Sequence, residues 1–267
     1  MIRALILLAM LTVVAPSTGG ANEPVPGHAR SKTYMLLVAH PDDENMIGGV
    51  LARLAREGHD VRVVIATDGK YSPLATDIPA GDALGAARRL ESQCAARELG
   101  IAPPVFLGID RLDTKNGVRQ YLDARPVFLA ALTDQLKAID PDVIISFGPD
   151  GEYGHPEHIV AAAGITEILL RDGLVDRYPL YYMGWLPEQV TDDDSLSHVD
   201  PRYMGVMARY TDEDERKQIA AGRCYVTQFT PEEMDAMAAG VKGAENVVYF
   251  RMFRVDEVSP GTASELP

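Results

Sequence analysis

Apolar runs of strand length alternate with segments of helical periodicity along most of the chain. A near-continuous apolar run predicts a buried parallel strand at 33–39, and further strands are predicted at 61–67, 105–109 and 143–147. Apolar residues at helical spacing predict helices at 48–56, 83–99, 126–139 and 157–171. Connections of this kind make βαβ units, which require a parallel sheet covered by helices on both faces. We therefore predict a doubly wound, mostly parallel α/β fold.

The last third of the chain is less regular. After residue 172, loops containing Pro and Asp lead to predicted helices at 212–221 and 231–239 and to a final strand at 247–253. We expect one domain over residues 33–258, because a single α/β domain commonly reaches this size. A flexible lead at 22–32 would precede it, and a disordered tail at 259–267 would follow.

Residues 1–21 have the pattern of an export signal. Arg3 supplies the positive charge, residues 4–14 form an apolar run, and residues 16–20 interrupt it with Pro and Gly. The run is shorter than the ~18–20 apolar residues that span a membrane. A lipid anchor is not supported, because the expected cleavage site has no Cys. We expect cleavage after Ala21 and a secreted or periplasmic chain without stable membrane insertion. An uncleaved anchor or a misassigned start codon is the alternative.

Composition and charge exclude several classes of protein. The chain is 46% hydrophobic and 24% charged, which is ordinary globular composition. Its net charge of −14 disfavours binding to nucleic-acid phosphates or to anionic membranes. An oxidising compartment would permit a disulfide between Cys94 and Cys224, but a small buried hydrophobe is the favoured interpretation of a helical residue such as Cys94. Neither thiol is assigned to a metal or to catalysis.

A cluster of acids follows the first predicted strand directly. His40 is followed by Pro41, Asp42, Asp43 and Glu44, and three such acids repel one another unless a cation or a proton neutralises them. If a helix begins near Pro41, His40 and Asp43 face the same side and both can reach one ion, while Asp42 points elsewhere. The simpler alternative is that Asp42 and Asp43 cap a helix. Capping explains one acid but not three acids with a histidine.

A second cluster follows the fourth predicted strand. A Gly-rich loop leads to Gly154, His155, Pro156, Glu157 and His158, and proline suits the first position of the next helix. The two histidines then lie at a helix N-terminus, on the same sheet edge as the first cluster. Taken alone, this histidine pair would be assigned more simply to the surface or to capping.

Together the two clusters offer the ligands of a catalytic metal site. Two histidines and one carboxylate, with an open fourth position, are typical of catalytic zinc, which lowers the pKa of a bound water to ~7. Asp42 would take a proton from the attacking water. His155, held off the metal, would stabilise the oxyanion or protonate the leaving group. These roles indicate hydrolysis of a carbonyl compound, although spacing alone leaves open which of Asp42 and Asp43 binds the ion.

These residues resemble the PIG-L/LmbE-like family of zinc-dependent de-N-acetylases. The resemblance rests on residues 39–44 and 154–158, with supporting similarity at 66–69, at Arg88 with Glu91, and at Lys217 with Thr227 and Gln228. The family implies a Rossmann-like fold and hydrolysis of an N-acyl group, typically N-acetyl on a glucosamine-containing molecule.

The resemblance also implies roles for individual residues. His40, Asp43 and His158 would bind the metal, Asp42 would be the general base, and His155 would assist the transition state. Arg88 would lie near the substrate, with a helix-surface salt bridge to Glu91 as the alternative. Glu44 would support the site or the fold.

Two further features bear on the resemblance. Tyr225 stands where family members commonly have histidine, so this region departs from the family pattern. Some relatives are thought to use a mobile tyrosine as general acid, and four tyrosines are candidates here: Tyr71, Tyr153, Tyr181 and Tyr182.

The leading hypothesis is an exported zinc hydrolase that removes acetate from an N-acetylglucosamine-containing sugar or glycoconjugate. One alternative is a metal-dependent amidase acting on a larger or lipid-linked N-acyl compound, and another is a non-catalytic carbohydrate- or metal-binding relative. A nucleotide-binding protein is disfavoured, because no GxGxxG motif follows the first strand. Iron, cobalt or manganese could replace zinc in such a ligand set.

Overall fold

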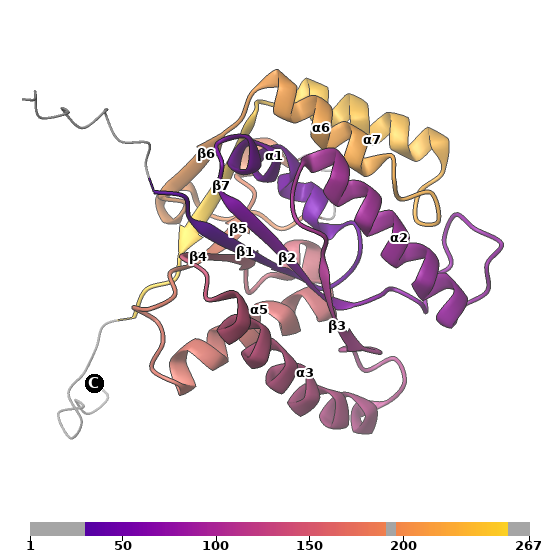
Figure 1. Ribbon diagram of the computed structural model, residues 1–267, viewed down its shortest axis with the longest axis vertical. Coiled ribbons are helices and arrows are strands. Elements are labelled where there is room, and N and C mark those ends of the chain that lie inside the picture. The colour runs from indigo at the N-terminus through magenta and orange to yellow at the C-terminus, as the bar shows by residue number, and fades with distance from the viewer. Residues whose placement is uncertain (1–29, 191–195, 256–267) are drawn as a thin grey trace, which may run out of the picture. The chain divides into compact units, whose positions relative to one another are not determined.

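The computed structural model describes residues 30–190 and 196–255 (Figure 1). The four strands predicted in the first part of the chain are present as β1 (Thr33–Val38), β2 (Asp60–Thr67), β3 (Val105–Ile109) and β4 (Val143–Phe147). The four helices predicted there are α1 (Gly48–Arg56), α2 (Asp82–Leu99), α3 (Val118–Ile139) and α5 (Pro156–Arg171). A short 3-10 helix (Asp43–Ile47) precedes α1, and a single turn, α4 (Gly151–Gly154), precedes α5. The later elements are β5 (Leu180–Gly184), β6 (Val206–Arg209), α6 (Asp212–Gly222), α7 (Pro231–Gly243) and β7 (Val247–Met252).

The largest differences from the sequence prediction concern α3, β5 and β6. Helix α3 begins at Val118, and Pro126, which was expected to start it, lies inside the helix. The proline removes one backbone hydrogen bond, but the helix continues because Phe128, Leu132 and Leu136 pack their side chains into the core. Strands β5 and β6 were not predicted. Both are short, and their strand conformation depends on pairing within the sheet rather than on local pattern.

Within the described residues the sheet has seven strands in the order β3-β2-β1-β4-β5-β7-β6. The first five are parallel, and β7 runs antiparallel to both β5 and β6. Helices α1, α2 and α6 pack together on one face, and α3 packs with α5 on the other (Figure 1). The prediction of a doubly wound, mostly parallel α/β fold is confirmed.

The strand order reverses between β1 and β4, and this reversal places the site. Leu36 of β1 is in register with both Val63 of β2 and Ile145 of β4, so the carboxyl ends of these strands lie side by side. In doubly wound sheets ligands bind outside the carboxyl ends of the strands at such a switch point. The chain turns after β1 into His40 and after β4 into the loop before His155.

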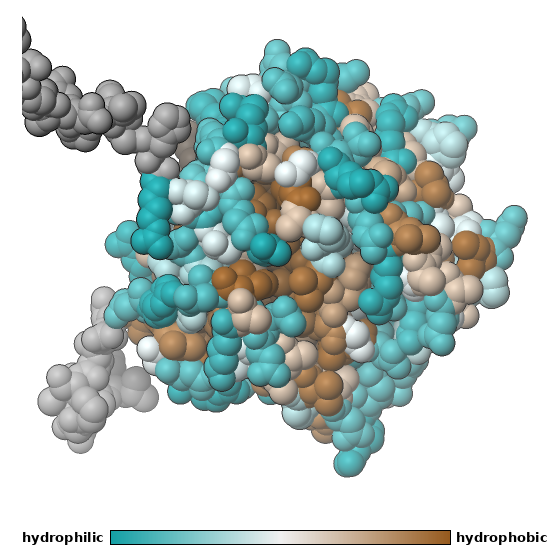
Figure 2. Space-filling model, in the orientation of Figure 1, coloured by the Kyte–Doolittle hydropathy of each residue, from teal (hydrophilic) through white to brown (hydrophobic). Residues whose placement is uncertain are grey.

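The central strands form the core of the molecule. Leu37, Val64 and Ile144 are fully buried, as near-continuous apolar strands of a covered parallel sheet should be. Figure 2 shows hydrophilic residues over much of one face, with hydrophobic residues visible in a band over β2 and β3 between α2 and α3. Among the described helices, none has the length and apolarity to cross a membrane.

A disulfide joins Cys94 of α2 to Cys224, which follows α6. The interpretation of Cys94 as a free buried hydrophobe is therefore wrong. The two cysteines are 130 residues apart, and they meet because α2 packs against α6 on the same face of the sheet. Nothing in the local sequence around either cysteine reports that packing.

Removing this disulfide should destabilise the fold. We expect the double variant Cys94→Ala, Cys224→Ala to lose about 2–4 kcal/mol of unfolding free energy, because the bond closes a long loop in the unfolded chain. Urea unfolding with and without a reductant measures the loss. Reductant should weaken the native chain by a similar amount and leave the double variant unchanged. If the urea midpoint of the native chain is the same with and without the reductant, the prediction is wrong.

The expected export signal at 1–21 and the expected tail at 259–267 lie outside the described residues, as does nearly all of the expected lead at 22–32. From Ser31 onward the described residues form one compact unit.

Candidate active site

The carboxylate of Asp43 is fixed by the backbone at the end of β1. The backbone N–H groups of Ala39 and His40 both donate to Oδ2 of Asp43, at 3.0 and 2.7 Å. The other oxygen, Oδ1, lies 3.3 Å from Nε2 of His158. The first and second clusters therefore meet through this carboxylate.

His40 has one ring nitrogen committed to a second carboxylate. Its Nε2 lies 2.7 Å from Oε2 of Glu157, and the backbone N–H of Leu112 donates to the other oxygen of Glu157 at 2.5 Å. Its Nδ1 lies 3.5 Å from Oδ2 of Asp43. A histidine whose outer nitrogen donates to a carboxylate is typical of metal sites, because that bond fixes the ring and raises the basicity of the inner nitrogen.

His158 is buried, and among the described residues neither of its ring nitrogens has a hydrogen-bond partner. Its ring stacks on Phe147, the last residue of β4, with centroids 3.9 Å apart and planes 8° from parallel. Its Nδ1 is directed at Oε2 of Glu152 at 3.6 Å, which leaves Nε2 directed at Asp43. A buried imidazole is rarely left unpaired, and a cation between His158 and Asp43 would satisfy Nε2.

The donor set fits a metal ion. Nδ1 of His40, an oxygen of Asp43 and Nε2 of His158 converge, which is the set of two histidines and one carboxylate expected for an open zinc site. His155 lies within the same cluster, since one ligand atom from each of the three histidines lies within 4.8 Å of the others. The structure thus brings together every residue assigned to the metal, and His155 with them.

His155 is oriented by the first turn of α5. It caps this helix, and its Nδ1 accepts the backbone N–H of Glu157 at 3.3 Å. An accepting Nδ1 means that the proton of the neutral ring is on Nε2, which leaves a donor on the free nitrogen. Burial, with the charges of the two other histidines, lowers the pKa of His155 to about 4.

Asp42 has an unusual backbone conformation. Its φ of 99° and ψ of −29° are in the left-handed region, and its side chain makes no capping hydrogen bond. Asp42 occupies the N-cap position of the 3-10 helix, but its side chain caps nothing, and Asp43 accepts from residues before the helix. The alternative in which these two acids cap a helix with their side chains is therefore wrong. Burial, with the adjacent charge of Asp43, raises the pKa of the Asp42 carboxyl. Non-glycine residues in this conformation are strained and cluster at functional sites.

A cavity of about 210 Å³ opens onto these residues. From the two clusters, its lining includes His40, Asp42, Asp43, His155 and Glu157, but not His158. Residues of the loops after β2 and β3, together with Arg88 and Gln228, complete it. Arg88 is buried, and its guanidinium donates to the backbone carbonyl of Ser72 and to Oε1 of Gln228. Glu91 instead accepts from Thr227, so the alternative of an Arg88–Glu91 surface salt bridge is not what the structure shows.

The four candidate tyrosines divide into two groups. Tyr71 and Tyr153 line the cavity, and the ring of Tyr153 lies 5.6 Å from that of His155. Tyr182 lies away from it and bonds Thr166, and Tyr181 lines a separate hollow.

The sequence pattern did not predict several residues of the site. Asp110 and Arg111 directly follow β3 and line the cavity, so the rule that chemistry follows the strands of such a sheet could have found them. Glu152 faces the outer ring nitrogen of His158, and Glu157 contacts that of His40. Their proximity in sequence to His158 was a signal, because ligating histidines usually pair with a carboxylate.

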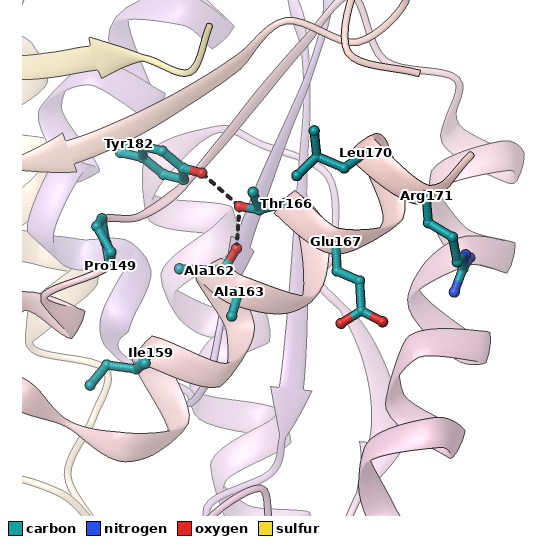
Figure 3. Close-up of a pocket in the computed structure, with 9 residues that line it drawn as sticks. All are labelled: Pro149, Ile159, Ala162, Ala163, Thr166, Glu167, Leu170, Arg171 and Tyr182. Carbon is teal, nitrogen blue, oxygen red and sulfur yellow. Dashed lines mark hydrogen bonds between the residues drawn. The ribbon is translucent and has the colours of Figure 1, made fainter. Parts of the chain in front are cut away.

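A larger hollow of about 640 Å³ lies on the outer side of α5. Figure 3 shows that Ile159, Ala163 and Leu170 line it, and that its hydrogen bonds are those of Thr166 with Tyr182 and with the Ala162 carbonyl. None of the histidines or acids of the two clusters reaches it. Its lining has one carboxylate, Glu167, but no histidine and no converging set of metal ligands, so the smaller cavity is the candidate active site.

Replacing Glu157 with glutamine should weaken metal binding. Glutamine keeps the size of the side chain but removes the charge that faces His40, and the loss of such a partner typically costs about 10–100-fold in metal affinity. Competition with a chromogenic chelator measures the affinity. Glu167→Gln, on the far side of α5, is the matched control and should bind the metal as the native chain does. Equal affinities in the two variants would contradict the prediction.

Comparison with known proteins agrees with this geometry. Residues 35–169 match the model of the PIG-L family, GlcNAc-PI de-N-acetylase. A 1D-myo-inositol 2-acetamido-2-deoxy-alpha-D-glucopyranoside deacetylase from Mycobacterium sp. (strain KMS) is 31% identical over 231 residues, covering 72% of each chain. An enzyme with the same name from Rhodococcus erythropolis is 35% identical over 168 residues, covering 57% of each chain. The chain thus spans little more than half the length of that relative.

A solved structure has the same fold. The N,N'-diacetylchitobiose deacetylase from Pyrococcus horikoshii superposes with a TM-score of 0.62 at 21% identity, and the match covers 84% of each chain. The fold and the two clusters define an α/β protein with a histidine–carboxylate site at the switch point of its sheet. The chain belongs to the PIG-L family.

Proposed function

We propose that the chain is a metal-dependent hydrolase, with zinc as the preferred ion, that removes the N-acetyl group from an N-acetylglucosamine-containing sugar or glycoconjugate. The convergence of His40, Asp43 and His158 carries the proposal, since His40 and Asp43 line the cavity and His158 is buried next to Asp43. Relatives named as deacetylases of N-acetylated glucosamine compounds support the choice of substrate.

The residues around the ligands have separate tasks. A divalent ion held by His40, Asp43 and His158 would polarise the amide carbonyl and lower the pKa of a water. Asp42 lines the cavity without a role in capping, and it accepts the proton of the attacking water. His155 donates a hydrogen bond from Nε2 to the developing oxyanion. Tyr153 lies beside His155 and is the candidate donor of a proton to the leaving amine.

The size of the cavity favours a short acyl group. At about 210 Å³ it lies below the roughly 300–1,000 Å³ of typical drug-sized ligand pockets, which leaves little room for a long acyl chain beside a sugar ring. Arg88, buried in the wall and always charged, can hold a sugar hydroxyl. The alternative of a larger N-acyl substrate requires the loops at the mouth to open.

Acetate release tests the proposal. The zinc-loaded chain is incubated with N-acetylglucosamine oligomers and with N-acetylglucosaminyl-inositol, alongside versions bearing N-butanoyl and N-octanoyl groups. We expect acetate release that a chelator abolishes and that falls as the acyl chain lengthens. Release of longer acyl groups alone would favour the larger-amide alternative. Metal-independent sugar binding without any hydrolysis would favour a non-catalytic relative.

We propose further that the chain is exported. The pattern at residues 1–21 and a disulfide, which persists in oxidising compartments, support export. Expression of the full chain in a bacterium with a periplasm should yield a product whose N-terminus is Asn22 in that fraction. Uncleaved, reduced protein in the cytoplasm would contradict this proposal.

A further inference from the structure

The segment after α6, residues 224–228, is bonded to helix α2 at three positions. Cys224 is bonded to Cys94, and Thr227 donates both its N–H and its hydroxyl to Glu91 at 2.8 Å each. Gln228 accepts from Arg88 in the cavity wall. Residues on either side of Tyr225 are thus fixed, and the direction of its side chain is fixed with them.

Tyr225 extends from this segment toward the turn after β1. It is 1% exposed, and its hydroxyl donates to Oε1 of Glu44, which is also buried. The other oxygen of Glu44, Oε2, accepts the backbone N–H of Asp42 at 3.2 Å. The carboxylate of Glu44 therefore accepts two hydrogen bonds, one from the hydroxyl of Tyr225 and one from the backbone of Asp42.

Asp42 needs such support because its left-handed backbone is unfavourable for a residue with a side chain. Its carbonyl accepts from the N–H of Asn45 at 2.9 Å, and its N–H is held only through Glu44 among the hydrogen bonds of the described residues. Freeing Glu44 would let the peptide before Asp42 turn, and the carboxylate of Asp42 would move relative to the cavity.

We propose that Tyr225 is a positioning residue for catalysis: through Glu44 it holds the backbone of Asp42 in the conformation that directs the general base into the cavity. The inference rests on the proposed function of Asp42. It gives a task to Tyr225, which stands where family members commonly have histidine, because the phenol reaches and orients Glu44 from the segment bonded to α2.

Kinetics of the zinc-loaded chain test this proposal. Tyr225→Phe removes only the hydroxyl and should lower kcat about 10-fold with KM and zinc content unchanged, the order of effect expected when one buried hydrogen bond is lost. Tyr178→Phe is the matched control, because Tyr178 is also buried and donates to a carboxylate, that of Asp140, far from the cavity. It should retain native kcat.

Two further measurements test whether Tyr225 acts on Asp42 through Glu44. Glu44→Met removes both acceptor oxygens, so it should lower kcat at least as much, and the double variant with Tyr225→Phe should be no worse than the poorer single variant. The amide hydrogen of Asp42 should exchange faster in Tyr225→Phe than in the native chain, and this holds even if the native chain shows no deacetylase activity. Unchanged exchange at Asp42, equal kcat losses in Tyr225→Phe and Tyr178→Phe, or additive losses in the double variant would each overturn the proposal.

Discussion

Replacing Asp42 with asparagine should lower kcat by about 10²–10⁴-fold, the range that a positioned general base contributes. Asparagine has the size of aspartate but cannot accept the proton of the attacking water. Asp42 is not among the side chains that converge on the ion position, so the affinity for zinc should stay within a few-fold of native. Acetate release under saturating substrate and zinc measures kcat.

Asp123→Asn is the matched control for this substitution. Asp123 lies on the surface of α3 and pairs with Arg119, so its loss should leave kcat unchanged. Retention of more than a tenth of native kcat by Asp42→Asn would assign the base to another residue. Loss of zinc from Asp42→Asn would instead make Asp42 a ligand, which would reverse the roles given to Asp42 and Asp43.

Replacing His158 with alanine should abolish both stoichiometric zinc and deacetylation. The substitution removes one of three protein ligands, and losing a ligand should cost more than the roughly 10–100-fold lost with its outer carboxylate partner. We expect an affinity at least 100-fold weaker than native, measured by chelator competition. Activity should fall below detection at zinc concentrations that saturate the native chain.

His59→Ala is the control for His158→Ala, because the His59 ring lies at the other end of the sheet, where it accepts the backbone N–H of Lys32. Its zinc affinity should be native. The stacked partner Phe147 is exposed to a new cavity in His158→Ala, so unfolding must be measured alongside. A folded His158→Ala variant that keeps one equivalent of tightly bound zinc would contradict the ligand assignment.

The fold could be predicted from the sequence where the signal is local. Apolar runs of strand length predicted β3 and β4 to the residue, although β3 lies at the edge of the sheet and only its Ile109 is buried. Strands β5 and β6 could not be predicted, because they are short and take their conformation from neighbouring strands. Helix α3 was cut short because Pro126 has a strong local preference that packing of the buried face overrides.

The site could be predicted in part for a topological reason. Residues that follow β1 and β4 must meet once the strand order is doubly wound, so the approach of His40 and Asp43 to His158 follows from the order of elements. No comparable rule predicts which residues of two helices far apart in the sequence come into contact. The Cys94–Cys224 bond and the approach of Tyr225 to Glu44 depend on how α6 packs against α2 and α1, which no local pattern reports.

The central claim is that residues of both clusters bind one metal ion. Anomalous diffraction at the zinc absorption edge, from crystals of the zinc-loaded chain, tests it most directly. We predict one peak at roughly 2.0–2.2 Å from Nδ1 of His40, an oxygen of Asp43 and Nε2 of His158, with the nitrogen of His155 outside bonding distance. A peak bound by the three histidines with Asp43 excluded, or no peak between β1 and β4, would contradict this account of the site.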